Sequence, residues 1–484
     1  MAQKTNVHGP FKDANILRAE FASAMSEMYR TEVPLYGDLI RIVHDINNAS
    51  VVASANDELI ADTAALRASA ERLTLERHGA IRLGTPNELQ TVKRIFSVLG
   101  MHPFGYYDLS VAGLPMHATC FRPSQVSSLD LNPFRVFTTL LRPELLKSEE
   151  AKAQALALLG KRKIFTDRLL QLLDIAQSRQ NQLTEEQAKE FIPEALLSFS
   201  WRPVAAATLK QYEILKNEHP ILADIACFQS AHINHLTPRT LNISAVQEAM
   251  KAAGMEAKSR IEGPPRRKCP ILLRQTSFLA LEESIKFRKG LSENDAGLIE
   301  GNHKARFGEI EERGAAVTAK GRDLYDRLLS ESLTKSVKAS PEEAEVIFSD
   351  VFKQFPDEWK DLRQQGLIYC EFRCVKKEAI HSMTQDDRLP LLEQLISEGF
   401  VKASPITYED FLPFSAAGIF QSNLQSSKNT SGGPELHAAN ADPSGFSSSL
   451  GSEPTDINSW YSQQQQSSLE KVAWELGFTV AQLA

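Results

Sequence analysis

One pattern of short elements occurs twice in this chain, and it limits the folds that the chain can adopt. The first copy begins with HGAIRL at 78–83, an alternating run typical of a strand. A helix should follow, because Thr85 and Pro86 form a helix start and Gly100 forms a helix end. Three runs rich in aromatic and β-branched residues then predict strands at 104–111, 115–123 and 134–143.

The second copy starts about 155 residues later and has the same order. A strand is predicted within 232–242, and a helix over 244–255 contains Gly254 as its end signal. A unit of this order, used twice, indicates an α+β protein built on two βαβββ modules. The three further strands of the second copy are predicted at 256–265, 270–278 and 304–318.

The rest of the chain is predicted to be mainly helical. Apolar residues at helical spacing open the chain at 12–32 and 57–75 and return after Arg142 and after Lys320. The stretch 425–468 is poor in apolar residues, so we expect a mobile loop there and a final helix after it. We therefore divide the chain into an N-terminal helical region (1–75), a first module (76–142), a helical insert (143–230), a second module (231–318) and a C-terminal helical cap region (319–484).

The composition argues against several classes of protein. The 54 Lys and Arg residues against 61 Asp and Glu give a net charge of -7, which disfavours nucleic acid or an anionic membrane as the main partner. No apolar stretch has the length of a signal-peptide core or a transmembrane helix. The five cysteines form no CxxC pair, which favours a reducing compartment. We expect a soluble, cytoplasmic protein that binds neither nucleic acid nor a membrane.

Polar residues at matching positions of the two copies suggest a site. His78, Ala80 and Arg82 alternate, so in a strand their side chains share one face. In the second copy His232 and His235 are three residues apart and point to opposite faces, so at most one of them can face the site. We expect this to be His235, although the spacing alone leaves His232 open.

The last strand of the second copy supplies carboxylates. Glu309 and Glu311 share a face, while Glu312 points the other way. Glu309 has the least solvated surroundings, and an ionised carboxylate there needs a partner such as a divalent metal. Two imidazoles and one carboxylate on adjacent strands form a facial triad, which is typical of non-haem Fe(II) sites for oxygen chemistry. The pattern is therefore the one expected for an iron site, with His78, Glu309 and one of the two histidines of the second copy as candidate ligands.

Longer segments of the chain resemble a known family. The run RHGAIRLGTPNELQTVKRIFSVLGMHPFGYYDL is similar to the first module of the vicinal oxygen chelate superfamily, in which paired βαβββ modules form a metal-holding half-barrel. Over residues 70–424 the chain resembles the 2-oxoadipate dioxygenase/decarboxylase family, also called hydroxyglutarate synthases. The segments that carry this resemblance are RHGAIRLGT, NPFRVFTTLLRPELL, HINHLTPRTLN, RQTSFLALEE, FGEIEERGAAVT and YEDFLPFSAAGIFQSNL.

The resemblance implies roles for individual residues. Arg82 becomes the catalytic residue that grips a substrate carboxylate, and Phe414 and Ser415 are placed against the substrate together with His78 and Arg82. Phe414 stands where the family commonly has Val, a change that alters the preferred chain length if this side chain forms the pocket wall. The implied Fe(II) ligands are His78, His235 and Glu309.

The implied activity is an iron-dependent dioxygenase and decarboxylase of lysine catabolism. It converts 2-oxoadipate and O2 to 2-hydroxyglutarate and CO2 without external 2-oxoglutarate. Two alternatives stay open at this point. One is a related chelate enzyme that uses Mn, Zn or Ni to isomerise or epimerise a 2-oxo acid. The other is a non-catalytic scaffold protein. The oligomeric state, the hydroxyl configuration and the preferred 2-oxo acid are left undetermined by the sequence.

Overall fold

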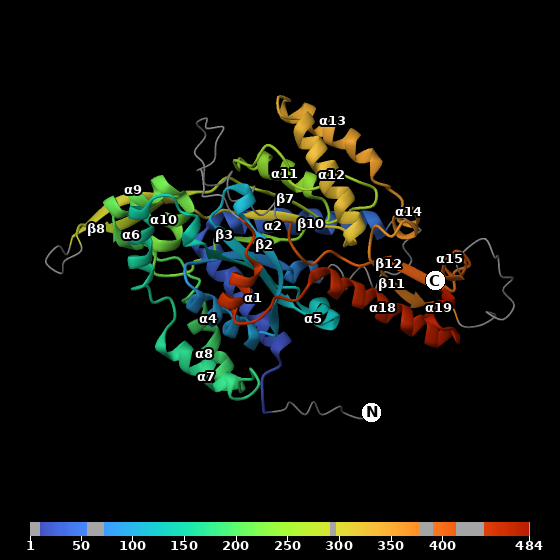
Figure 1. The fold of residues 1–484 in the computed structure, drawn as a ribbon, viewed down its shortest axis with the longest axis horizontal. Helices are drawn as coiled ribbons and strands as arrows, with labels where there is room; N and C mark the ends of the chain where they lie inside the picture. Colours follow the sequence, from blue (N-terminus) through green and yellow to red (C-terminus); the bar gives the residue numbers. More distant parts are fainter. Residues whose placement is uncertain (1–9, 56–71, 291–296, 377–390, 413–439, 484) are drawn as a thin grey trace. The chain divides into compact units, whose positions relative to one another are not determined.

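The structure is a computed structural model that describes residues 10–55, 72–290, 297–376, 391–412 and 440–483 of a mixed α+β chain (Figure 1). The chain forms two compact units. The predicted division of the sequence into five regions is more detailed than these two units and stays a prediction. The first unit comprises Met1–Ile261, Gln275–Glu312 and Pro413–Thr455, and the second comprises Glu262–Arg274, Arg313–Leu412 and Asp456–Ala484.

The first copy of the repeated pattern has the predicted order of a strand, a helix and three strands. Thr85 caps its helix by accepting a hydrogen bond from the Glu88 amide, and Pro86 is the first helical residue. Gly100 has a φ of 67°, as expected of a residue that follows a helix. The elements are β1 (Arg77–Leu83), α4 (Pro86–Val98), β2 (Met101–Asp108), β3 (Met116–Pro123) and β4 (Arg135–Leu141).

These strands form a five-stranded sheet with the order β2-β3-β4-β1-β6, in which β6 (His235–Pro238) comes from the second copy. β1 is parallel to β4 and antiparallel to β6. In the β1–β6 register Ala80 lies opposite His235, and His78 lies opposite Thr237. The first strands of the two copies are therefore neighbours, and the two histidines lie close together.

The second copy is less regular than predicted. β6, α11 (Ile243–Ala252), β7 (Leu273–Ser277) and β10 (Glu309–Arg313) confirm four of its five elements. The strand predicted at 256–265 is wrong, because this range contains isolated bridge residues at Ala257 and Glu262 and no continuous strand. Gly263 has a φ of 106° and two prolines follow it, and neither feature suits a strand.

β10 lies beside the chain that follows β6. A parallel bridge joins Arg239 to Glu311, and the Thr240 amide donates a hydrogen bond to the Glu311 carbonyl at 2.7 Å. β10 also pairs with β7. The first strands of both copies and the last strand of the second copy therefore run close together, which brings residues far apart in sequence to one place.

A separate three-stranded sheet was not predicted. It consists of β5 (Val204–Thr208), β8 (Glu282–Arg288) and β9 (Leu298–Lys304) in the order β5-β8-β9. Only two residues of β8 and one of β9 are buried, so these strands lack a strong apolar pattern. The helical insert thus contains β5 as well as α6 (Glu149–Leu159), α7 (Asp167–Gln177), α8 (Glu185–Leu196), α9 (Leu209–Glu218) and α10 (Pro220–Cys227).

The chain opens with helices, as predicted. α1 (Ala14–Glu32) matches the helix expected at 12–32 and buries Phe21, Met25 and Tyr29 in the core. α2 (Pro34–Ala55) was not predicted, although Tyr36, Leu39 and Val43 are buried at helical spacing. Most of the helix predicted at 57–75 lies outside the described residues, and residues 72–75 are helical.

The loop predicted at 425–468 is wrong where the structure describes it. α17 (Pro443–Leu450) begins after Asp442, which caps it, and buries Phe446 and Leu450. α18 (Ile457–Leu476) starts well before the predicted final helix and buries Trp460 and Tyr461. A few apolar residues at helical spacing are sufficient when a core is available to receive them. Residues 425–439 lie outside the described part of the chain.

The other elements of the second unit include two predicted features. Ser340 and Glu343 form the predicted capping box of α13 (Pro341–Val351), and β11 (Cys370–Cys374) confirms the predicted strand. No helix among the described residues is long and apolar enough to cross a membrane. The remaining elements of this unit are α12 (Ala319–Lys335), α14 (Trp359–Gln364), α15 (Leu391–Ser397), β12 (Val401–Pro405) and α19 (Val480–Leu483).

Candidate metal centre

Three side chains that are distant in sequence meet in the first unit. His78 comes from β1, His235 from β6 and Glu309 from β10, and one ligand atom of each lies within 4.8 Å of the other two. His78 Nε2 is 3.1 Å from Glu309 Oε1, and His235 Nε2 is 3.9 Å from Glu309 Oε2. At least 95% of each side chain is buried. The predicted set of two imidazoles and one carboxylate is therefore assembled.

Buried contacts hold the strands that carry these residues. The Tyr29 hydroxyl of α1 contacts the carbonyls of Asn234 at 2.9 Å and Phe307 at 2.8 Å. These carbonyls precede His235 by one residue and Glu309 by two. The Phe307 ring also stacks on the His235 imidazole, with centroids 4.8 Å apart. One helix thus fixes the backbone at two of the three ligand positions.

A buried glutamate ties the start of β1 to its neighbours. Glu76 accepts hydrogen bonds from Arg135 of β4 at 2.9 Å and from Arg239, which follows β6, at 3.1 Å. Burial alone would raise the pKa of Glu76, but the charges of Arg239 and Arg135 outweigh it and lower the pKa to about 2. The carboxylate is therefore ionised, and its partners hold β1 where His78 begins to line the site.

A second group of side chains orients the ligands. The Nδ1 atom of His78 is 2.9 Å from Glu311 Oε2, so a carboxylate contacts the imidazole on the side away from Glu309. Glu309 Oε1 accepts hydrogen bonds from Gln275 Nε2 and, at 3.4 Å, from Thr237 Oγ1. Such contacts fix the tautomer and orientation of metal-binding side chains.

The charges in the site suit a cation. Burial would raise the pKa of Glu309, but His235 and His78 outweigh it and lower the pKa, so Glu309 is ionised. Burial lowers the pKa of His235 to about 3, which keeps its imidazole neutral and able to coordinate. Burial by itself would lower the pKa of His78, but the carboxylates of Glu311 and Glu309 outweigh burial, so the pKa of His78 is raised overall.

The residues present fit a divalent metal. The Glu309 Oε2 atom is buried and has no hydrogen-bond partner among the described residues, so it offers lone pairs to an ion. Two imidazole nitrogens and a carboxylate oxygen are the donors of a facial triad, a set that binds divalent first-row metals. The structure therefore supports a metal centre at the predicted place.

The other histidine of the pair lies in a different cluster. His232 Nε2 is 3.2 Å from Asp224 Oδ1. Of the two histidines, His235 is therefore the one that lies with His78 and Glu309. Arg82 contacts the same carboxylate through Nη1, 2.5 Å from Asp224 Oδ2, and only 3% of its surface is exposed. Arg82 is thus buried on β1 with its cation beside Asp224. Phe414 and Ser415 lie outside the described residues.

Comparison with known proteins gives this site a context. The family model of 2-oxoadipate dioxygenase/decarboxylase matches residues 21–423. The chain belongs to this family. The Pseudomonas putida 2-oxoadipate dioxygenase/decarboxylase is 44% identical over 472 residues, which are 96% of this chain and 98% of that protein. The Escherichia coli protein of the same name is 45% identical over 460 residues, which are 94% of this chain and 97% of that protein.

Solved structures agree with this family. The crystal structure of the hydroxyglutarate synthase in complex with 2-oxoadipate from Pseudomonas putida matches with a TM-score of 0.83 and 42% identity, covering 97% of this chain and all of that one. An uncharacterized protein from Shigella flexneri matches with a TM-score of 0.80 and 42% identity, over 95% of this chain and 99% of that one. The mixed α+β fold is thus that of a hydroxyglutarate synthase.

The sequence reasoning missed two contacts, that of Glu311 with His78 and that of Asp224 with Arg82. Glu311 was placed on the face of Glu309, and that spacing of two residues was the signal that it also reaches His78. Asp224 was not considered. Its signal is a single acid within PILADIAC, where the neighbouring residues of α10 are all buried. An acid in such a helix needs a cationic or hydrogen-bonding partner.

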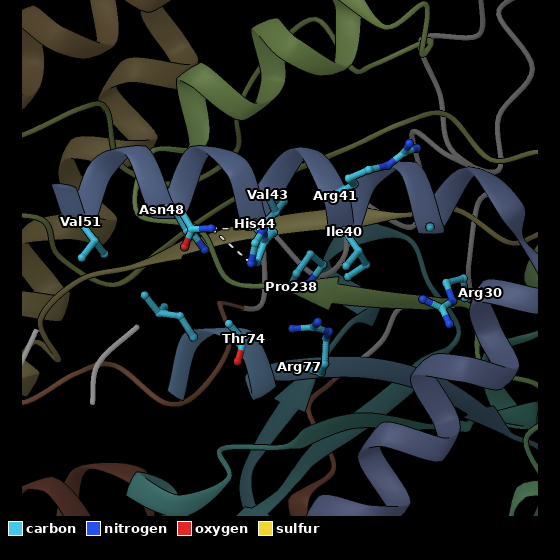
Figure 2. A pocket seen from close by; sticks show the side chains of 13 residues that line it. Arg30, Ile40, Arg41, Val43, His44, Asn48, Val51, Thr74, Arg77 and Pro238 are labelled. Carbon is cyan, nitrogen blue, oxygen red and sulfur yellow. Dashed lines mark hydrogen bonds between the residues drawn. The ribbon is translucent and has the colours of Figure 1, made fainter. Parts of the chain in front are cut away.

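A cavity of about 420 Å³ lies beside α2 (Figure 2). It is bordered by α2, by residues 73 and 74, and by the ends of β1 and β6. Arg77 lines it, whereas His78, the next residue of β1, lies in the triad. The two residues therefore point to opposite sides of the strand, as the alternation of a strand requires. The cavity shares no residue with the triad.

Proposed function

We propose that this chain is an Fe(II)-dependent enzyme that converts 2-oxoadipate and O2 to 2-hydroxyglutarate and CO2. The observation that carries the proposal is the buried triad of His78, His235 and Glu309 in a chain of the 2-oxoadipate dioxygenase/decarboxylase family. The reaction balances without a further reductant, because both atoms of O2 appear in the products. It belongs to the breakdown of lysine in the cytoplasm.

The residues of the chain prepare the site for the metal. His235, neutral because of its burial, offers a lone pair, and the Glu311 carboxylate orients the imidazole of His78 so that Nε2 faces the site. Gln275 and Thr237 hold one oxygen of Glu309. When bound, Fe(II) supplies open coordination positions for a 2-oxo acid and O2, together with the redox chemistry that O2 activation needs.

Arg82 binds a carboxylate of the substrate and is the catalytic residue in the sense that it touches and orients the substrate. A guanidinium presents several N–H donors in one plane and matches a carboxylate better than an ammonium group does. Arg82 lies four residues after His78 on β1, so the strand fixes the distance between the substrate carboxylate and the metal ligands. Phe414 and Ser415 complete the substrate wall in this proposal.

We also propose a half-barrel around the metal. The five-stranded sheet that ends in β6 continues, through the bridge between Arg239 and Glu311, to β10 and β7. Two βαβββ modules of the vicinal oxygen chelate type account for this arrangement, with the second module lacking one regular strand. The triad lies where the modules adjoin, since His78 comes from the first module and the other two ligands come from the second.

The test is anaerobic loading of the purified protein with Fe(II), followed by addition of O2 and a panel of 2-oxo acids. We expect O2 consumption, CO2 release and 2-hydroxyglutarate with 2-oxoadipate. The absence of CO2 release from every acid would refute the proposal. Isomerisation of a 2-oxo acid with Mn, Zn or Ni would instead favour a related chelate enzyme. Lack of any turnover, despite metal binding, would favour a non-catalytic scaffold.

A further inference from the structure

We infer that Asp224 is a positioning residue that aims Arg82 at the carboxylate of the substrate far from the 2-oxo group, and so helps to select dicarboxylic 2-oxo acids. The inference rests on the proposed function, because it assigns Arg82 to the substrate. It starts from a cluster that supplies no metal ligand and surrounds Arg82, formed by Arg82, Asp224, His232, His303 and Tyr212.

Asp224 is the centre of this cluster. Its Oδ2 atom is 2.5 Å from Arg82 Nη1, and its Oδ1 atom is 2.8 Å from His303 Nε2 and 3.2 Å from His232 Nε2. Only 2% of Asp224 is exposed. Burial would raise the pKa of Asp224, but Arg82 and His232 outweigh it and hold the pKa well below its usual range. The carboxylate is therefore a fixed negative charge beside the Arg82 guanidinium.

Further contacts restrain the direction of the Asp224 carboxylate. The Tyr212 hydroxyl lies 3.0 Å from His303 Nδ1, so His303 is held between a hydroxyl and the carboxylate. The Trp201 ring packs edge-on against His232, with centroids 4.7 Å apart. Because Asp224 has partners on both oxygens, it cannot rotate without breaking one contact. Arg82 therefore contacts a carboxylate whose orientation is restrained by His303 and His232.

This geometry bears on substrate selection. Arg82 has five N–H donors, and the contact of its Nη1 atom with Asp224 restrains the direction of the guanidinium. A guanidinium with a fixed direction loses less conformational entropy when it binds a carboxylate. A 2-oxo acid with a second carboxylate gains from this contact, whereas an acid of the same length with a methyl end does not. Asp224 should therefore affect the two substrates unequally.

The experiment compares kcat/KM for 2-oxoadipate with kcat/KM for 2-oxohexanoate, which has the same chain length and no second carboxylate. Asp224→Asn keeps the size and one oxygen of the side chain but removes its charge. We expect the ratio of the two kcat/KM values to fall about tenfold or more, mainly through the KM for 2-oxoadipate. Iron content should equal that of the wild type, because the triad is intact.

The matched control is Glu393→Gln, which removes the carboxylate partner of Arg363 in the second unit and leaves the Arg82 cluster unchanged. It should leave the ratio at the wild-type value. If Asp224→Asn lowers both kcat/KM values equally, its role is only structural and the inference is overturned. If Asp224→Asn does not fold, the His303→Gln variant is measured instead, because it weakens the contact that restrains the Asp224 carboxylate. A fall of about threefold in the ratio of the two kcat/KM values supports the inference, and an unchanged ratio overturns it.

The same measurements separate this inference from the proposed function. Wild-type protein that consumes no O2 with 2-oxoadipate refutes the proposed function, and the inference fails with it. Wild-type protein that turns over 2-oxoadipate, together with an Asp224→Asn variant of unchanged ratio, leaves the proposed function standing and overturns the inference alone.

Discussion

The contact between His78 and Glu311 gives the sharpest test of the metal centre. Glu311→Gln keeps the size of the side chain and removes the charge that faces His78 Nδ1 at 2.9 Å. Both side chains are almost fully buried, at 1% and 0% exposure, so water cannot replace the contact. A hydrogen bond to a charged group contributes about 1.5–3 kcal/mol. Loss of most of it weakens metal binding by about 10-fold to 100-fold, or about 1.4–2.7 kcal/mol.

The assay is anaerobic Fe(II) titration in competition with a chelator of known affinity, followed by the same titration with Zn(II). Glu312→Gln is the matched control, because the Glu312 carboxylate accepts a hydrogen bond from the Ile243 amide and alternation places it on the strand face opposite to Glu309 and Glu311. Glu312→Gln should bind metal as the wild type does. A Glu311→Gln variant within about twofold of the wild type would refute the reasoning, since the His78 contact would then contribute nothing to affinity.

Three further predictions follow from the described contacts. Arg82→Ala should keep its iron, measured by metal analysis, but lose most 2-oxoadipate turnover; unchanged kinetics would remove Arg82 from the mechanism. Tyr29→Phe should lower the free energy of unfolding by about 1 kcal/mol in denaturant titrations, since it loses the contacts with the Asn234 and Phe307 carbonyls; no change would show that these contacts do not stabilise the fold. Burial lowers the pKa of His219 to about 4, below its value in the unfolded chain. The contribution of neutral His219 to the free energy of unfolding, up to about 3 kcal/mol, is therefore present above pH 6.5 and is lost as the pH falls towards 4. His219→Asn should retain the cap on the Ile221 amide and flatten the pH dependence of unfolding in this range, and an unchanged pH profile would contradict the assignment.

The sequence by itself determined the features that depend on neighbouring residues. The caps at Thr85 and Ser340 are local hydrogen bonds between a side chain and an amide three residues later, so they are visible in the sequence. The alternation of His78 and Arg82 is equally local, because strand geometry places every second side chain on one face. The repetition of the unit, together with the family resemblance, then led to His235 and Glu309 as the partners of His78.

Tertiary structure decided what depends on contacts between distant residues. His232 and His235 are three residues apart, and only the folded structure shows that His235 belongs to the triad while His232 contacts Asp224. The role of Asp224 itself depends on Arg82, 142 residues away. Likewise, α17 forms because the core receives Phe446, which a composition poor in apolar residues did not predict.

The physical reason is the range of the interactions. Caps, turns and strand alternation are set by interactions within a few residues, so they can be predicted without knowledge of distant contacts. A buried charge or a short helix is stable only when a partner from elsewhere in the chain compensates the cost of burial or ordering. For this protein the sequence therefore predicted the three residues that form the candidate metal centre, and the fold decided which side chains contact them.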